Sequence, residues 1–177
     1  DLFKNLVQLV SHRMNYSMSD IRSKILDFDI LKEKSIAIQN SGKKIVFTNG
    51  CFDILHSGHI HTLSEAKKNG DILIVAVNSD SSVRELKGKN RPINNQNDRA
   101  LIIACLSFVD YVIVFDEGTP EKIICDLLPD VLIKGKDYEG KMIAGEDCLK
   151  ANGKVIKLID LIENTSTTNI INKILNR

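Results

Sequence analysis

From Lys43 onward, the apolar positions of the chain alternate between two kinds of spacing. Short, almost continuously apolar runs rich in β-branched residues are typical of strands that are covered on both faces. Such runs occupy residues 44–48, 71–77, 111–115, 131–133 and 155–158. Segments with the apolar spacing of helices lie between or after these runs, at residues 58–69, 96–106, 119–127 and 166–175.

This alternation predicts an α/β fold, because right-handed crossovers between parallel strands place helices on both faces of one sheet. We expect a doubly wound, parallel, five-stranded sheet of Rossmann-like type over residues 43–177. In such sheets ligands bind beyond the carboxyl ends of the strands, where the strand order reverses. The first strand-to-helix junction is therefore the expected ligand site.

Residues 1–42 follow a different pattern and carry no recognisable chemistry. A short amphipathic helix is indicated by Leu2, Leu6, Leu9 and Val10. A second helical stretch, ending before Ser41, is indicated by Ile21, Ile25, Leu26 and Leu31. We interpret residues 1–42 as an N-terminal helical extension that packs on the core or on a second subunit.

Composition narrows the classes of partner. The 177 residues are 43% hydrophobic and 27% charged, with a formal net charge of +1. This balance disfavours a nucleic-acid or membrane-surface binder, and no apolar run reaches the roughly 20 residues that span a bilayer. We expect one cytoplasmic domain with no nucleic-acid and no membrane partner.

The four cysteines are far apart and form no CxxC pair; they are Cys51, Cys105, Cys125 and Cys148. Zinc sites use closer ligand pairs, and an even number of cysteines does not by itself indicate disulfides in a chain of this size. We therefore expect reduced and mostly buried cysteines.

The candidate chemistry lies in residues 48–59, where a strand ends near Thr48 and a helix begins near Ser57. Helix N-termini present free N–H groups that bind phosphate. His56 and His59 are three residues apart and lie on one side of the first turn. Gly58 between them has no Cβ, which lets a phosphate approach the backbone.

Two imidazoles over a bound phosphate can donate hydrogen bonds to oxygens whose charge grows in a transition state. A nearby anion raises the pKa of a histidine, so one ring can become protonated when phosphate binds. Two alternatives are ordinary helix-cap histidines and a zinc site with His61 as third ligand. Zinc is disfavoured because His61 points away and no fourth ligand is evident.

An HxGH segment at this junction resembles the signature of a nucleotidyltransferase superfamily that includes cytidylyltransferases. The longer motifs resemble the D-glycero-β-D-manno-heptose 1-phosphate adenylyltransferases, from about residue 25 to the C-terminus. They lie at residues 48–56, 70–71, 76–80, 86–88, 91–94, 129–135 and 166–168. In many members this domain follows a sugar-kinase domain, and the chain resembles the stand-alone form.

The resemblance implies that ATP and heptose 1-phosphate give ADP-heptose and pyrophosphate, for lipopolysaccharide biosynthesis. It implies direct in-line attack without a covalent intermediate, with Mg²⁺ held mainly by the nucleotide phosphates and no protein metal centre. A homodimer is also expected. The rivals are a glycerol-3-phosphate cytidylyltransferase, which shares the HxGH and Ser-Thr-Thr motifs, a catalytically silent nucleotide-binding module, and a nucleic-acid-binding domain.

Site residues are assigned from the matching motifs. The catalytic candidates are His56, His59 and Lys87. The nucleotide-binding candidates are Gly50, Cys51, Phe52, Asp53, His56, His59, Lys134, Asp137, Asn164, Thr165, Ser166 and Thr167. The substrate-binding candidates are Lys87, Arg91, Asn78 and Asp80. Of these, Lys87 and Arg91 lie in what we interpret as a basic loop after the second strand.

Three further positions are open. Lys136 and Asn164 replace glycines of the family, and a lysine would be strained if that glycine has a positive φ. Arg99 either contacts a ligand or pairs with a carboxylate such as Asp98 of a neighbouring chain. The hydroxyls at 165–168 can cap a helix, hold phosphates, or do both.

Overall fold

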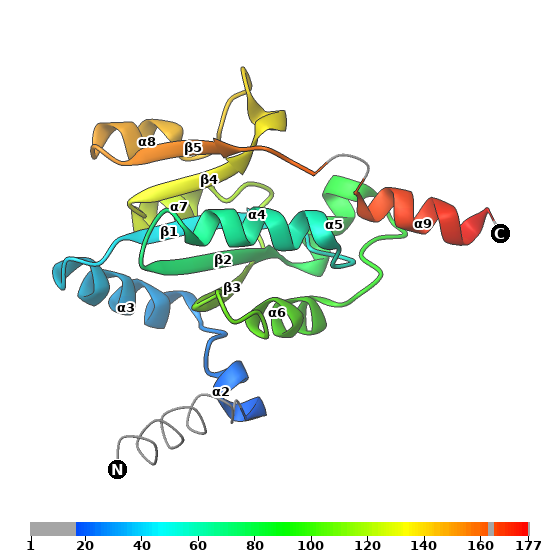
Figure 1. Cartoon of the computed structure of the whole chain (residues 1–177), viewed down its shortest axis with the longest axis horizontal. Helices are drawn as coiled ribbons and strands as arrows, with labels where there is room; N and C mark the ends of the chain where they lie inside the picture. Colours follow the sequence, from blue (N-terminus) through cyan, green and yellow to red (C-terminus); the bar gives the residue numbers. More distant parts are fainter. Residues whose placement is uncertain (1–16, 163–164, 177) are drawn as a thin grey trace, which may run out of the picture.

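The computed structural model describes residues 17–162 and 165–176. Within them one parallel sheet of five strands has the order β3-β2-β1-β4-β5 (Figure 1). The strands are β1 (Ile45–Gly50), β2 (Ile72–Asn78), β3 (Tyr111–Phe115), β4 (Val131–Gly135) and β5 (Val155–Ile159). All five coincide with the apolar runs, so the predicted sheet is confirmed.

Helices cover both faces of the sheet because alternate side chains of each strand enter different cores. Val46 and Val75 face one core, which α4 (Ser57–Lys67) and α6 (Gln96–Ala104) cover. Phe47 and Ile74 face the other core, which α3 (Phe28–Asn40), α7 (Glu121–Leu127) and α8 (Glu146–Ala151) cover. This two-sided burial explains why the strands are almost continuously apolar.

The strand order reverses between β1, the central strand of the sheet, and its neighbour β4. Three short elements gather at the carboxyl edge of the strands: α5 (Asp80–Lys87), the 3₁₀ helix η1 (Lys136–Tyr138) and α9 (Thr167–Leu175). Helices α5 and α8 were not predicted. Lys87, predicted in a loop, is instead the last residue of α5, which Ser79 caps at its start.

The N-terminal extension corrects one prediction. Where we expected a single helical stretch, the structure has two helices, α2 (Met18–Arg22) and α3. Helix α3 ends at Asn40, as predicted. Between them Ile25 forms a parallel bridge with Val112 of β3. The pairing of this segment with the sheet edge explains the break. The helix predicted around Leu2–Val10 lies outside the described residues.

The cysteine prediction was wrong for one pair. A disulfide joins Cys125 of α7 to Cys148 of α8, with their Cα atoms 5.7 Å apart. The two are 23 residues apart in sequence and become neighbours only because α7 and α8 pack side by side on the sheet. Of the two free cysteines, Cys51 is half-buried and Cys105 is exposed.

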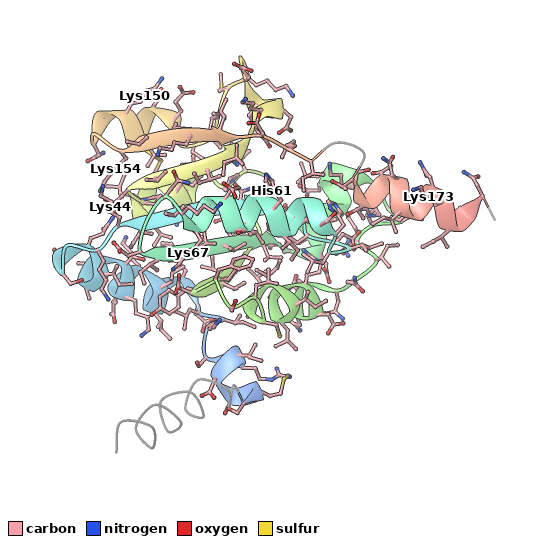
Figure 2. All side chains as sticks on the ribbon, viewed as in Figure 1. Lys44, His61, Lys67, Lys150, Lys154 and Lys173 are labelled. Atoms are coloured by element: carbon pink, nitrogen blue, oxygen red, sulfur yellow. A yellow bond between two sulfur atoms is a disulfide. The ribbon has the colours of Figure 1, made fainter. Side chains whose placement is uncertain are left out.

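Two lysines labelled in Figure 2, Lys67 and Lys154, pair with carboxylates of neighbouring elements. Lys67 of α4 contacts Asp110 at 2.5 Å, and Lys154 contacts Asp130 at 2.8 Å. The charges of these two lysines are therefore balanced locally. Among the described residues, no helix combines the length and apolarity needed to cross a membrane.

Candidate active site

A cleft of about 760 Å³ opens at the carboxyl edge of the sheet, a volume typical of small-molecule sites. Its floor is the end of β1 and the head of α4, at the point where the strand order reverses. The loops after β3, β4 and β5 and the start of α9 form its walls. A cleft thus lies at the junction where the sequence predicts the ligand site, and ligand binding there stays a prediction.

His56 and His59 lie side by side in this floor. Their ring centroids are 3.7 Å apart with an interplanar angle of 21°, and Phe52 meets His59 edge-on at 5.2 Å. His56 is the N-cap residue of α4, but its side chain accepts no hydrogen bond from the helix. His56 thus occupies the N-cap position without capping the helix through its side chain, so that its ring satisfies none of the N–H groups at the helix head.

Burial keeps both imidazoles neutral. It lowers the pKa of His59 to about 4, with a smaller contribution from the proximity of His56, and it also lowers the pKa of His56. The Nδ1 atoms of both rings are buried and have no hydrogen-bond partner among the described residues. The two neutral rings are closely packed and have unsatisfied nitrogens. A bound anion would raise the pKa of these imidazoles.

Gly58 serves a different neighbour from the one expected. A Cβ at this position would lie 2.4 Å from Oγ1 of Thr165 and 3.1 Å from the His56 ring. The space that we assigned to a phosphate is thus filled by Thr165. The glycine allows the segment before α9 to pack directly on the head of α4.

Asp53 is buried and its carboxylate is engaged inside the protein. It forms an ion pair with Nε of Arg91 and accepts hydrogen bonds from the backbone N–H groups of Ile93 and Asn94, at 2.7 and 3.0 Å. The Asn94 side chain in turn donates to the Asp53 carbonyl. Asp53 therefore ties the loop that carries Arg91 to the β1–α4 loop.

Lys134, at the carboxyl end of β4, is a buried cation with a neutral partner. Its Nζ donates to Oδ1 of Asn49 and lies 5.1 Å from the centre of the Tyr138 ring. Burial lowers its pKa to about 8, and the nearby Asp137 opposes this shift. A buried ammonium that lacks a charged partner is suited to bind an anion that enters the cleft.

The hydroxyls before and within α9 are engaged in structural contacts. Ser166 caps α9 by accepting from the N–H of Asn169 at 3.0 Å. Thr167 donates to the carbonyl of Ile54 at 3.2 Å, and Thr165 donates to that of Ile162 at 2.9 Å. The capping role is confirmed, and the phosphate-binding role stays a prediction. Asn164 lies outside the described residues.

The cleft brings together most of the predicted residues, namely Gly50, Cys51, Phe52, Asp53, His56, His59, Asn78, Lys87, Arg91, Lys134, Asp137, Thr165, Ser166 and Thr167. Asp80 does not line it and pairs with Arg99. Arg99 itself is fully buried and does not line the cleft, and it pairs with a carboxylate as one of the two readings expected, but with Asp80 of its own chain. Lys136 pairs with Asp160 at 2.5 Å and does not have a positive φ, so the expected strain is absent.

Sequence reasoning missed Leu161 and Ile162 after β5 and two further parts of the wall. Gly118, Thr119 and Pro120 follow β3, and Met142 and Ala144 precede α8. The first group could have been found from the rule that ligands meet the carboxyl ends of strands. The second group follows an unpredicted turn, so no comparable signal marks it.

Residues 47–173 match the family described as cytidylyltransferase-like. The bifunctional protein HldE of Campylobacter fetus is 53% identical over 156 residues, which are 88% of this chain and 32% of that protein. HldE of Aliarcobacter butzleri is 47% identical over 169 residues, or 96% of this chain and 35% of that protein. The chain thus spans about a third of the length of these curated relatives.

Two solved structures share the fold. The lipopolysaccharide core biosynthesis protein from Thermoplasma volcanium has 35% sequence identity and a TM-score of 0.56, covering 70% of this chain and 100% of that one. Pantoate–β-alanine ligase from Francisella tularensis has a TM-score of 0.51 over 86% of this chain and 79% of that one. At 18% identity the second likeness concerns the fold alone.

Proposed function

The chain belongs to the cytidylyltransferase-like family, and we propose that it transfers AMP from ATP to D-glycero-β-D-manno-heptose 1-phosphate. The products are ADP-heptose and pyrophosphate. The observation that carries the proposal is the stacked pair of His56 and His59 at the head of α4, in the cleft where the strand order reverses. The name of the Thermoplasma volcanium relative agrees with a role in lipopolysaccharide assembly.

The reaction requires no general base. A phosphate oxygen of the sugar phosphate, already ionised at neutral pH, attacks the α-phosphorus of ATP in line. The new O–P bond forms as the bond to the bridging oxygen breaks, and pyrophosphate leaves with that electron pair. The protein positions the two phosphates and stabilises the charge that develops on their oxygens.

The charge of the cleft suits a polyphosphate. Three cationic side chains line it: Lys87, Arg91 and Lys134. Among the described residues only two carboxylates do so, Asp53 and Asp137. Because Asp53 and Arg91 pair with each other, Lys87 and Lys134 face only Asp137 of these two. When phosphates enter, their charge raises the pKa of the neighbouring imidazole, so that one ring of the pair can donate as a cation.

The donor set fits Mg²⁺ held mainly by the phosphates. Within residues 17–162 and 165–176, no three His, Cys, Asp or Glu side chains converge on one point. Asp137 is the cleft carboxylate left to contact a phosphate-bound ion. Mg²⁺ commonly keeps few protein ligands, and when bound it would offset charge on the departing pyrophosphate.

A homodimer and a cytoplasmic location complete the proposal. Ile174 and Leu175 of α9 are 65% and 76% exposed, and we assign these two apolar side chains to the interface. The dimer is tested by the molar mass in solution with and without Leu175→Lys. We propose the cytoplasmic location because the reaction consumes ATP.

The test of the reaction is pyrophosphate release from ATP, CTP, GTP and UTP in turn, with Mg²⁺ and either heptose 1-phosphate or glycerol 3-phosphate. We expect turnover with ATP and heptose 1-phosphate only. Turnover with CTP and glycerol 3-phosphate would keep the mechanism and replace the substrates. Folded protein that is inactive with every pair would overturn the proposal and favour a silent nucleotide-binding module.

A further inference from the structure

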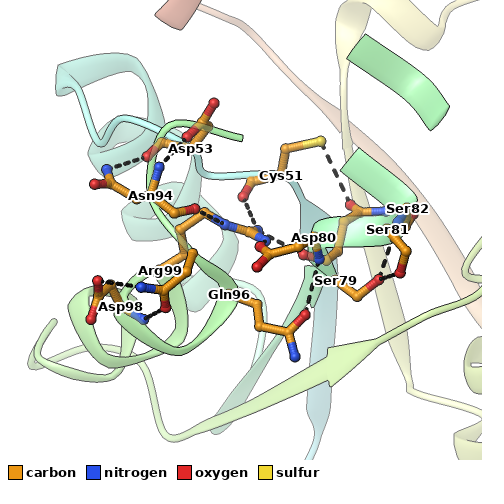
Figure 3. A network of polar contacts seen from close by, with 12 residues as sticks. Cys51, Asp53, Ser79, Asp80, Ser81, Ser82, Asn94, Gln96, Asp98 and Arg99 are labelled. Carbon is orange, nitrogen blue, oxygen red and sulfur yellow. Dashed lines mark hydrogen bonds and ion pairs between the residues drawn. The ribbon is translucent and has the colours of Figure 1, made fainter. Parts of the chain in front are cut away.

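Arg99 of α6 is the largest side chain that is fully buried among the described residues. Its guanidinium lies at the centre of a polar network (Figure 3). Nε donates to the carbonyl of Asn94 at 2.9 Å, and Nη1 donates to the carbonyls of Cys51 and Asn78, both at 2.7 Å. Nη2 forms an ion pair with Asp80 at 2.8 Å.

These four acceptors come from different parts of the fold. Cys51 lies just after β1, Asn78 ends β2, Asp80 begins α5, and Asn94 lies in the loop before α6. Cys51 and Asn78 also line the cleft, whereas Arg99 does not. One planar cation thus joins the carboxyl ends of two neighbouring strands directly beneath the site.

The loop before α6 is held from two sides. The N–H of Asn94 donates to the carboxylate of Asp53, while the Asn94 carbonyl accepts from Arg99. Arg91, three residues earlier, pairs with the same carboxylate. The β1–α4 loop, which leads to His56, is therefore linked at Cys51 and Asp53 to the segment that carries Arg91.

If Arg99 only balanced charge inside the protein, one carboxylate would be sufficient as its partner. Asp80 supplies it, yet three of the four hydrogen bonds of Arg99 go to backbone carbonyls. A guanidinium presents its N–H groups in a fixed planar fork, so it fixes the relative directions of its acceptors. A lysine ammonium in its place could keep the charge but could not hold all four acceptors in this geometry.

We propose that Arg99 is a positioning residue, which fixes the β1–α4 loop and the loop before α6. Its role is to hold His56, His59 and Arg91 in the positions in which they contact the phosphates. The proposal rests on the proposed nucleotidyl transfer. Because Arg99 does not line the cleft, its loss leaves substrate binding largely intact and lowers the rate of the chemical step. A displacement of about 1 Å at a reacting group can cost about 100-fold in rate.

The experiment compares Arg99→Met, Arg99→Lys and the control Arg84→Met, which removes an exposed guanidinium from neighbouring α5. The kcat per folded molecule and the KM for ATP are measured at saturating acceptor. We expect Arg99→Met to lose about 100-fold in kcat with KM within about threefold. Arg99→Lys should remain at least tenfold below wild type, and Arg84→Met should equal wild type.

Hydrogen exchange supplies a second readout that needs no activity. In both Arg99 variants, amides at residues 49–56 and 93–95 should exchange faster, while those of β4 and β5 keep their protection. If Arg99→Met does not fold, Arg99→Lys carries the comparison. A folded Arg99→Lys with wild-type kcat, or acceleration spread evenly over the sheet, would overturn the proposal. Inactive wild-type protein would refute the proposed function, and the exchange pattern would still report on the loops.

Discussion

The imidazole rings of His56 and His59 stack with their centroids 3.7 Å apart. Two cationic rings at this distance would repel each other, and burial already disfavours the charged form of each. Near neutral pH the pair is therefore uncharged until an anion arrives. This relationship connects the proposed chemistry to measurable properties of the free protein.

The first prediction concerns stability and pH. His59 has a pKa of about 4 in the folded protein against an ordinary 6.5, so the unfolded chain binds the proton first. The neutral His59 therefore contributes up to about 3 kcal/mol to the free energy of unfolding. This contribution is fully present above pH 6.5 and is lost as the pH falls toward 4. Urea unfolding at pH 7.5 and 4.5 should show a smaller difference in His59→Asn than in wild type.

His61 lies on the same helix and outside the cleft lining, so His61→Asn is the matched control. It should keep the difference between the two pH values seen in wild type. An unchanged pH dependence in His59→Asn would contradict the burial that we assign to this ring.

The second prediction is a gain of stability with a loss of function. Lys134 has a pKa of about 8 when folded against 10.5 ordinarily, so its burial as a cation costs free energy below pH 8 and ceases to do so above 10.5. Lys134→Met should raise the free energy of unfolding at pH 7 by about 1–3 kcal/mol. Because it removes a cleft cation, kcat/KM should fall by about tenfold or more.

Lys154→Met is the control, because Lys154 pairs with Asp130 away from the cleft. It should change activity little and should not raise stability. A Lys134→Met variant that is less stable and fully active would refute this account of the buried lysine.

The third prediction concerns the disulfide between Cys125 and Cys148, which are 23 residues apart. Closing a loop of this size stabilises the folded state by about 3 kcal/mol through the entropy of the unfolded chain. Reductant should lower the free energy of unfolding by about that amount in wild type, and should have no effect on the double variant Cys125→Ala/Cys148→Ala. Mass spectrometry that counts four free thiols in unreduced protein would exclude the bond.

The fourth prediction concerns the contact between α4 and the segment before α9. In Gly58→Ala the added methyl group overlaps Oγ1 of Thr165, so the free energy of unfolding should fall by about 1–3 kcal/mol. Thr165→Ala in the same chain should restore part of this loss. Gly118→Ala is the control, because its nearest new neighbour would be 4.0 Å away. Additive effects of Gly58→Ala and Thr165→Ala would contradict direct contact.

The sequence was sufficient for the features that depend on local spacing. The strands could be located because each is apolar on both faces, as Val46 and Phe47 show by entering opposite cores. His56 and His59 could be paired because they are three positions apart at a helix start. Their position at the strand reversal followed from the topology that the alternation predicts.

The missed features depend on contacts between distant residues. The bridge from Ile25 to Val112 breaks a pattern that reads as one helix. The disulfide requires α7 and α8 to pack together, and the burial of Arg99 requires four separate segments to supply acceptors. Helix α5 was missed because its eight residues contain only two apolar ones, Val83 and Leu86.

The most direct test of the central claim is the single-turnover rate of AMP transfer from ATP to heptose 1-phosphate, followed as ADP-heptose. Wild type, His56→Asn and His59→Asn are compared at saturating substrates, with folding checked by circular dichroism. We expect each histidine variant to be slower by about 10²–10³-fold, the usual effect of losing one donor to a developing oxyanion. Rates within a few-fold of wild type for folded His59→Asn would contradict the account.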